Sequence, residues 1–326
     1  MTLRNFIDHV MEQLAPLYPQ QECKAMAVRM LKEMLAGYKG YEHLVEPATE
    51  LDTFQLEGTA EKNQSSRQHS GTEKYLLSCV ERLATGEPLQ YVMGFEWFCG
   101  HKFNVAPGVL IPRPETEELV YKAIGFAESA QKEAQQHQSP TPLRILDICT
   151  GSGCIAWSMA AALPQSEVYA CDISQQALQI ARAQQIQCAD NIPAKVKFLE
   201  CDILSQQAQQ KIAQECGQEP FHLIVSNPPY VCECEKSQMR ENVLNHEPHL
   251  ALFVPDNDPL KFYRAIAQLS GRILAPGGAL MFEINERFGA ETAQMMQQMG
   301  YTNCQVLQDL FGKDRMVVGY KESVSL

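Results

Sequence analysis

The sequence lacks the features that mark a membrane or exported protein. No apolar run approaches the roughly 20 residues that a helix needs to cross a bilayer. Residues 1–8 do not show the basic and then apolar pattern of a signal peptide. We therefore expect a cytoplasmic protein that does not bind a membrane. The 326 residues are enough for one large or two ordinary domains, each with a proper core.

A surplus of basic charge is also missing. The chain carries 27 basic and 39 acidic side chains, so its formal net charge is −12. Nonspecific binding to nucleic acid needs clustered Lys and Arg, so this balance argues against a nucleic-acid partner, although it leaves room for a local basic groove. The 12 cysteines are scattered, with no C-x-x-C pair and no zinc spacing. We therefore expect reduced, mostly buried cysteines and no metal ion.

The pattern of apolar residues divides the chain into a helical N-terminal domain, a linking β-hairpin and a larger domain. These parts are expected over 1–88, 89–110 and 111–326. The first part has apolar stripes at helical spacing and no convincing strand. Its expected elements are a helix capped by Thr2 and broken at Pro16, a helix over 22–38, a polar and flexible loop over 57–71 and a helix over 72–83.

The larger domain has the alternation of short strands and helices that is typical of a doubly wound parallel α/β sheet. It begins with a Pro-led helix to about Gln131 and a Gln-rich linker over 132–142. Strands are expected over 143–148, 167–171, 196–199, 221–225 and 279–284. Further elements are helices over 152–163, 174–187, 258–274 and 288–299, a turn over 275–278, and a closing hairpin of 303–308 with 315–320.

The stretch Asn227-Pro228-Pro229-Tyr230 directly follows the apolar run 221–225. The prolines end this strand, and ligands bind at the carboxyl ends of the strands in such sheets. The side-chain oxygen of Asn227 and the carbonyl of Pro228 can accept hydrogen bonds from a planar amino or amide group, and Tyr230 can stack on it. A Pro-Pro pair alone is common in ordinary loops. The whole motif favours a catalytic site, and it resembles that of class I methyltransferases acting on planar nitrogens of DNA, RNA or protein glutamine.

Residues 147–156 form the expected first strand-to-helix turn. Gly151 and Gly153 let the backbone approach a ligand, the helix N-terminus behind them offers free N–H groups, and Asp147 can orient the loop. Asp172, at the end of the next strand, can bind the ribose hydroxyls of an adenosine cofactor. Asp202, at the end of the strand after that, can contact the adenine edge, either through its side chain or through the backbone of Ile203. The expected cofactor-binding residues are Cys149, Thr150, Gly151, Ser152, Gly153, Asp172, Asp202, Ile203 and Asn227.

The same turn also suits NAD, and three details favour another cofactor. Ala156 stands where a full G-x-G-x-x-G would have its third glycine. With Asp147 and Asp202, the set resembles the S-adenosylmethionine site of class I methyltransferases. One position departs from that pattern, because Cys149 replaces the usual first glycine of the loop. Cysteine is small, so we expect the turn to keep its shape if the φ angle of Cys149 is negative.

Two further sites have alternative interpretations. The block 111–119 reads as a Pro-led helix start, in which Glu115 and its acidic neighbours favour the helix dipole. That interpretation does not account for Arg113, which lies between two prolines. A rigid loop that presents one guanidinium is often functional, so Arg113 is a candidate functional residue. Glu247, before Pro248, either closes the pocket or is a loop acid in solvent.

The order of these features resembles the peptide chain release factor glutamine N5-methyltransferases over nearly the whole chain. The most discriminating part is the block 112–117, and the polar insert at 57–71 is a departure. The resemblance implies a class I, Rossmann-like methyltransferase fold, with S-adenosylmethionine as cofactor and S-adenosylhomocysteine as product. It also implies that the substrate is the glutamine of the Gly-Gly-Gln loop in class 1 release factors, held partly by the N-terminal domain. The implied substrate-binding residues are Arg113, Glu115, Asn227, Pro228, Tyr230 and Glu247. We expect a monomer.

Four alternatives remain open from the sequence. A glutamine methyltransferase for ribosomal protein L3 is similar elsewhere but tends to differ in the block 112–117. A nucleic-acid adenine or guanine N-methyltransferase shares the Asn-Pro-Pro-Tyr chemistry, but the net charge argues against it. An NAD-dependent dehydrogenase leaves the motif at 227–230 unexplained, and a non-enzymatic adaptor needs neither half of the site.

Overall fold

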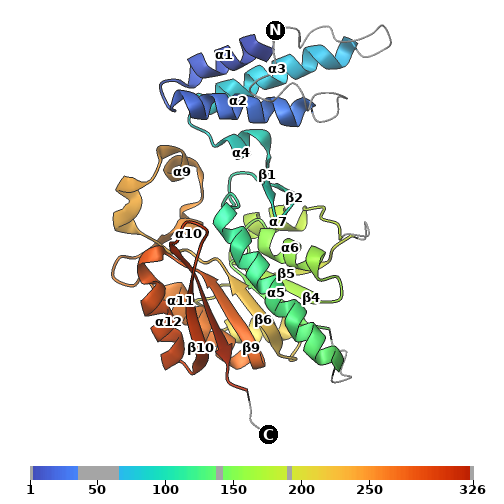
Figure 1. The fold of residues 1–326 in the computed structure, drawn as a ribbon, viewed down its shortest axis with the longest axis vertical. Helices are drawn as coiled ribbons and strands as arrows, with labels where there is room; N and C mark the ends of the chain where they lie inside the picture. The colour runs from blue at the N-terminus through green and yellow to red at the C-terminus, as the bar shows by residue number, and fades with distance from the viewer. Residues whose placement is uncertain (1–2, 36–65, 137–141, 189–192, 324–326) are drawn as a thin grey trace. The chain divides into compact units, whose positions relative to one another are not determined.

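The computed structural model describes residues 3–35, 66–136, 142–188 and 193–323 (Figure 1). They form two compact units, one comprising the chain up to Gly94 together with Glu241–His246, and the other comprising Phe95–Arg240 and the chain from Glu247 onward. The predicted cap Thr2, the end of the helix over 22–38 and the loop over 57–65 lie outside the described residues. Residues 66–71, predicted as part of that loop, belong to a helix instead.

The first unit is helical, as predicted. Its elements are α1 (Leu3–Leu14), α2 (Gln20–Leu35), α3 (Ser66–Leu83), α4 (Leu89–Met93) and α9 (Glu241–His246). The buried faces of α1 and α3 supply much of its core, including Phe6, Val10 and Leu83. The short helix α4 lies where the β-hairpin was predicted to begin. Pro88 fixes the backbone before it, and Gly94 ends it in the left-handed conformation, so the local breakers override the strand-like run of apolar residues.

The second unit contains a mixed sheet that confirms the predicted doubly wound fold. In the described residues, seven strands form this sheet in the order β10-β11-β9-β6-β3-β4-β5. Their bounds are β3 (Arg144–Ile148), β4 (Glu167–Asp172), β5 (Val196–Glu200), β6 (Phe221–Ser226), β9 (Leu274–Glu283), β10 (Tyr301–Gln308) and β11 (Asp314–Lys321). The strands from β9 to β5 are parallel, while β10 and β11 add antiparallel.

Helices cover both faces of this sheet, with α5 and α6 on one face and α11 and α12 on the other (Figure 1). Strand residues alternate between the two cores: Ile145 packs in the first, while Leu146 and Ile148 pack in the second. The helices are α5 (Pro114–Gln136), α6 (Cys154–Ala162), α7 (Gln175–Arg182), α8 (Ala208–Cys216), α10 (His249–Leu252), α11 (Lys261–Ile273) and α12 (Gly289–Gln298). Smaller elements are the hairpin β1 (Phe95–Phe98) with β2 (His101–Asn104), the pair β7 (Val231–Cys232) with β8 (Phe253–Val254), and the 3-10 turns η3 (Glu233–Gln238) and η4 (Glu286–Phe288).

Several predicted bounds in this unit were wrong. The helix α5 continues to Gln136, because its Gln- and Ala-rich end contains good helix formers and no breaker. The helix α7 ends at Arg182 rather than near 187, and α8 was not predicted. The predicted turn over 275–278 lies within β9. There the register with β6 jumps from Phe221↔Leu274 to Leu223↔Ala279, so these residues form a bulge in the strand.

The strand order places a topological switch point between β3 and β6. The chain runs outward through β4 and β5 on one side of β3, and then through β6 and β9 on the other. In open α/β sheets, ligands bind outside the carboxyl ends of the strands at such a point. The structure therefore directs attention to the residues that follow β3, β4, β5 and β6.

Candidate active site

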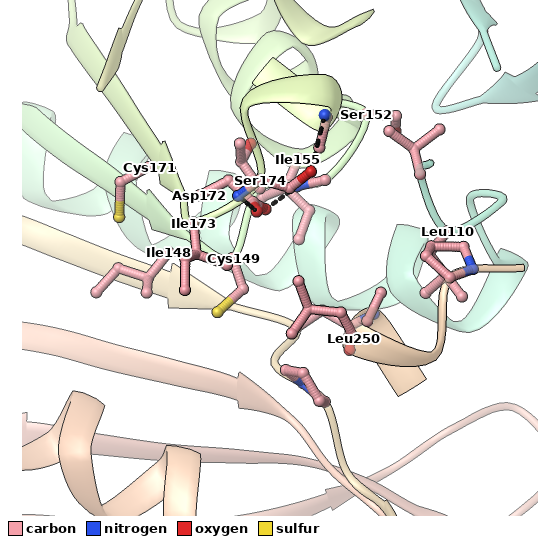
Figure 2. A pocket seen from close by; sticks show the side chains of 18 of the residues that line it. Leu110, Ile148, Cys149, Ser152, Ile155, Cys171, Asp172, Ile173, Ser174 and Leu250 are labelled. Carbon is pink, nitrogen blue, oxygen red and sulfur yellow. Dashed lines mark hydrogen bonds between the residues drawn. The ribbon is translucent and has the colours of Figure 1, made fainter. Parts of the chain in front are cut away.

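A cavity lies at the carboxyl ends of these strands (Figure 2). Its wall is built from the loop after β3, the ends of β4 and β5 and the start of the motif after β6. The residues that line it include Arg113, Thr116, Cys149, Thr150, Gly151, Ser152, Cys154, Cys171, Asp172, Cys201, Asp202, Ile203, Asn227 and Pro229. Leu110 and Leu250, which lie outside the sheet, complete the wall. Of the residues predicted from the sequence, Gly153, Glu115, Pro228, Tyr230 and Glu247 are not among the described residues that line it.

Asp147 organises the loop after β3, as the sequence indicated. Its buried carboxylate accepts hydrogen bonds through Oδ2 from the Thr150 hydroxyl at 2.5 Å and from the Ala156 N–H at 3.2 Å. These bonds tie the last residues of the strand to both the turn and the first turn of α6. The other oxygen, Oδ1, has no hydrogen-bond partner within the described part of the chain. Burial raises the pKa of Asp147 to about 7.

Asp172 holds the loop from the adjacent strand. Its Oδ2 accepts a hydrogen bond from the Gly151 N–H at 2.9 Å, and its Oδ1 accepts one from the Ser174 N–H at 2.9 Å. Figure 2 shows this carboxylate among the lining residues. Each carboxylate oxygen has a second lone pair, so the group can still accept two hydroxyl donors from a ligand. Burial raises the pKa of Asp172, and the backbone hydrogen bonds oppose that shift.

The two glycines of the turn have different roles. Gly151 has φ +55°, and a Cβ placed on it would meet no atom within 4 Å, so this glycine leaves open space beside the cavity. Gly153 has φ +81°, and its Cβ would lie 2.9 Å from the Trp157 ring and 3.1 Å from Cβ of Ala181. The sequence predicted that both glycines admit a ligand. In the structure, only Gly151 faces the cavity, while Gly153 permits close packing within the fold.

Cys149 adopts a backbone conformation that the sequence analysis did not expect. Its φ is +62°, in the left-handed region, so the condition of a negative φ was wrong. The turn keeps the shape that a glycine would give it, although a side chain in this region costs roughly 1–2 kcal/mol. The Cys149 side chain packs against the second core of the sheet, which helps to hold this conformation.

Replacing Cys149 by glycine is expected to give a more stable protein than replacing it by alanine. Both variants lack the thiol, so their difference isolates the backbone preference at φ +62°. We expect a free energy of unfolding about 1 kcal/mol higher for Cys149→Gly, because alanine retains the left-handed strain that glycine avoids. Urea unfolding of the two variants measures this difference. An alanine variant of equal or greater stability would contradict a positive φ at this position.

The remaining wall of the cavity carries neutral thiols. Cys149, Cys154, Cys171 and Cys201 all line it, and none is in a disulfide. Burial raises the pKa of each thiol, so they are uncharged at neutral pH. Within the described residues, no group of three or more His, Cys, Asp or Glu side chains is arranged to hold a metal ion. The wall suits an apolar, aromatic part of a ligand.

Asp202 and Ile203 follow β5 and line the same cavity. Oδ1 of Asp202 accepts a hydrogen bond from the Leu204 N–H at 2.9 Å, which shapes the loop. The loop, the acids and the thiols together fit the parts of S-adenosylmethionine. The backbone is open at Gly151, and Asp172 offers a carboxylate for the ribose hydroxyls. The apolar wall, with its polar edges, fits the adenine ring.

The Asn-Pro-Pro-Tyr motif is anchored to neighbouring elements. Nδ2 of Asn227 donates a hydrogen bond to the Thr116 hydroxyl at 3.2 Å. The Tyr230 hydroxyl donates a hydrogen bond to Oε1 of Glu283 at 3.0 Å. The backbone N–H of Tyr230 donates one to the Leu252 carbonyl at 3.2 Å. The ring of Tyr230 is thus held at both ends.

Glu283 is a buried acid at the end of β9, and sequence reasoning missed it. It is 1% exposed. Burial raises its pKa, while the hydroxyls of Thr116 and Tyr230 and the charge of Arg315 oppose this shift. The signal in the sequence was a single acid within the otherwise apolar run 279–284, because a Glu in a buried strand is rare unless it is paired.

Arg113 and Glu247 form an ion pair. The Arg113 guanidinium lies 2.6 Å from Oε1 of Glu247, and the Ile111 N–H donates to Oε2 at 3.0 Å. The Glu247 side chain is 1% exposed and that of Arg113 is 32% exposed. Glu247 is therefore not a loop acid in solvent: it fixes the segment 111–113, and Arg113 lines the cavity with its charge compensated.

This topology, with a glycine turn after the first parallel strand and an acid at the end of the second, defines a class I methyltransferase. Residues 133–250 match the family model described as the methyltransferase small domain. The release factor glutamine methyltransferase of Bacteroides thetaiotaomicron is 39% identical over 309 residues, covering 95% of this chain and 96% of that protein. That of Flavobacterium psychrophilum is 38% identical over 317 residues, covering 97% and 98%. The chain belongs to the release factor glutamine methyltransferase family.

Among solved structures, a release factor-specific protein-(glutamine-N5) methyltransferase from Alicyclobacillus acidocaldarius is 28% identical, with a TM-score of 0.38. The match covers 68% of this chain and 99% of that one. Family membership rests on the sequence relatives. No helix in the described ranges is both long and apolar enough to span a membrane.

Proposed function

We propose that this enzyme transfers a methyl group from S-adenosylmethionine to the side-chain amide nitrogen (N5) of the glutamine in the Gly-Gly-Gln motif of class 1 peptide chain release factors. The observation that carries the proposal is that Gly151, Asp172 and Asn227 line one cavity. A cofactor cradle and a planar-nitrogen motif therefore meet at one place. The names of the relatives, which cover nearly the whole chain, support the choice of substrate.

The residues that would hold the cofactor come from three strand ends. Residues 149–153 form the turn, Asp172 takes the ribose hydroxyls, and Asp202 with the Ile203 backbone takes the adenine edge. When bound, the sulfonium supplies an electrophilic methyl group. The thiol-lined wall excludes water from the aromatic part of the ligand.

The acceptor amide is held by the motif after β6. The Asn227 side-chain oxygen and the Pro228 carbonyl accept its two N–H bonds, and Tyr230 packs on its plane. An amide nitrogen is a poor nucleophile because its lone pair is delocalised, so the contribution of these residues is orientation. Pro229 keeps the segment rigid. The amide needs no strong base before transfer, because the proton lost afterwards is very acidic.

The protein substrate contacts other parts of the chain. In this proposal, the helical residues 1–88 help to hold the release factor, 89–110 link the parts, and 111–326 carry out the transfer. Arg113 and Glu115 contact the substrate near the cavity, and Glu247 fixes Arg113 through the ion pair. The enzyme acts as a cytoplasmic monomer without a metal ion or a nucleic-acid partner.

Replacing Asp172 by alanine is expected to weaken cofactor binding by about tenfold or more, because each hydroxyl contact to a carboxylate contributes roughly 1.5–3 kcal/mol. Isothermal titration with S-adenosylhomocysteine measures the change. A 2′,3′-dideoxy analogue provides the control: wild type should bind it more weakly than the parent ligand, and Asp172→Ala should not distinguish the two. Equal discrimination by both proteins would remove Asp172 from the ribose site.

The proposed reaction is tested by methyl transfer from labelled S-adenosylmethionine to three purified acceptors: a class 1 release factor, ribosomal protein L3 and duplex DNA. Label is expected on the release factor and is expected to disappear when its Gly-Gly-Gln glutamine is replaced. Label on L3 or DNA alone would keep the chemistry at Asn227 but overturn the substrate assignment.

A further inference from the structure

A carboxamide such as that of Asn227 can present either of its two ends, the oxygen or the NH2 group, to a ligand. Its oxygen accepts hydrogen bonds and its NH2 group donates them, and the two ends exchange by a rotation of 180°. Only the oxygen can accept an N–H of the acceptor glutamine. An inverted Asn227 would place donor against donor, so the proposed reaction needs some feature that selects one orientation.

Glu283 lies beside Asn227 because of the sheet register. The parallel pair β6–β9 aligns Ser226 with Phe282, so Asn227, directly after β6, lies next to Glu283, the last residue of β9. The Glu283 carboxylate accepts hydrogen bonds from two hydroxyls, that of Thr116 at 2.5 Å through Oε2 and that of Tyr230 at 3.0 Å through Oε1. In its ionised form Glu283 has no hydrogen to donate, so both hydroxyls point their hydrogens toward it.

Thr116 transmits this direction to Asn227. A threonine hydroxyl has one hydrogen, and Glu283 takes it. The Thr116 oxygen can then only accept, and the group that lies 3.2 Å from it is Nδ2 of Asn227. With Nδ2 committed to Thr116, the side-chain oxygen is the free end of the carboxamide. With Glu283 ionised, the positions of these hydrogens therefore give Asn227 the orientation that acceptor binding needs.

We propose that Glu283 and Thr116 are positioning residues that fix the Asn227 carboxamide with its oxygen available to the acceptor amide. The same carboxylate holds the Tyr230 hydroxyl, so one buried acid orients two residues of the motif. This inference rests on the proposed function, since it assigns the means by which Asn227 selects the acceptor N–H. Three distant segments contribute: α5 supplies Thr116, the loop after β6 supplies Asn227, and β9 supplies Glu283.

The hydrogen bond between Thr116 and Glu283 is well protected from solvent, which strengthens its effect. Thr116 is 2% exposed and Glu283 is 1% exposed, so water does not compete for this hydrogen bond. Leaving such a group without its partner has a larger effect than losing an exposed hydrogen bond. The Thr116 backbone is also fixed, because its N–H donates to the Arg113 carbonyl at 3.0 Å in the first turn of α5.

The test uses the full-length enzyme, S-adenosylmethionine and a purified class 1 release factor in steady-state methyl transfer. Thr116→Val keeps the size of the side chain but removes the hydroxyl, so Asn227 loses its fixed orientation. We expect kcat to fall by at least about tenfold, with KM for the release factor unchanged within about threefold, because the contact acts on the reacting amide rather than on the whole interface. Thr116→Ser keeps the hydroxyl and is expected to retain kcat within about threefold of wild type.

A double-mutant cycle separates positioning from a general structural effect. If Thr116 acts through Asn227, then Thr116→Val should change kcat by less than about twofold once Asn227 is already alanine. Calorimetric affinity for S-adenosylhomocysteine checks that each variant folds, and Thr116→Ala deletes the same hydroxyl should valine not be tolerated.

The outcomes are distinct. If wild type does not methylate the release factor glutamine, the proposed function fails. If wild type does so but Thr116→Val matches Thr116→Ser, or if the loss caused by Thr116→Val persists in the Asn227→Ala background, the positioning role fails and the proposed function stands.

Discussion

Replacing Asn227 by alanine is expected to lower kcat for methyl transfer by about 100-fold or more, in the range seen when one preorganised hydrogen bond to a reacting group is lost. The reason is that the amide nitrogen reacts only when its lone pair is directed at the methyl group. In the proposed reaction, Asn227 supplies one of the two hydrogen-bond acceptors that hold the amide nitrogen in that direction. Its side chain is anchored on Thr116, so the contact requires no rearrangement during the reaction.

Cofactor affinity is the control for this variant. Asn227 was also expected to contact the cofactor, but the turn after β3 and Asp172 keep their hydrogen bonds without its side chain, so Kd for S-adenosylhomocysteine should change by less than about threefold. Steady-state kinetics with the release factor give kcat, and calorimetry gives Kd. Turnover by Asn227→Ala within about threefold of wild type would show that this carboxamide does not orient the acceptor.

Replacing Asp147 by asparagine is expected to change the pH dependence of stability by the largest amount of any single substitution considered. Burial raises the pKa of Asp147 to about 7 in the folded protein. In the unfolded chain the pKa is near the ordinary value of roughly 3.9. Between these values the folded state binds more protons than the unfolded state, so the stability of wild type falls as pH rises through this window.

The size of this effect follows from the two pKa values. About three pKa units correspond to on the order of 4 kcal/mol, lost progressively between about pH 4 and pH 7. Asparagine does not titrate, and its amide oxygen can accept the hydrogen bonds from Thr150 and Ala156. The difference in free energy of unfolding, wild type minus Asp147→Asn, should therefore decrease across that range.

Urea unfolding at several pH values measures this difference. A buried acid that is not coupled to Asp147, such as Glu283, contributes to both proteins equally and cancels in the comparison. Parallel curves for the two proteins would mean that Asp147 is ionised in the folded state at its ordinary pKa, and the carboxylate would then need a compensating partner.

The parts of the fold that the sequence predicted are those set by local patterns. Apolar runs of strand length, each followed by a helical pattern, were sufficient to place β3, β4, β5 and β6 within a residue or two. The proposed cofactor turn was recognisable because Asp147 and the two glycines are close in sequence. Asp172 and Asn227 were predictable because Asp172 ends a buried strand and Asn227 directly follows one.

The interactions that the sequence did not predict join residues far apart in the chain. Thr116 and Glu283 are separated by 167 positions, and Arg113 and Glu247 by 134. A single sequence contains no signal that pairs them, since the pairing depends on the sheet register and on the placement of α5. Backbone conformation at Cys149 was missed for another reason. The surrounding turn enforces a positive φ there, against the residue's own preference.

The bulge at 275–278 has a consequence for how the protein can change over time. It lies at the amino end of β9, where the register with β6 jumps between Phe221↔Leu274 and Leu223↔Ala279. Beyond the jump, the pairing runs without interruption to Ser226↔Phe282, next to Asn227 and Glu283. Insertions or deletions within 275–278 can therefore be absorbed at the bulge. The alignment of the two strands next to Asn227 is insulated from changes in the length of that segment.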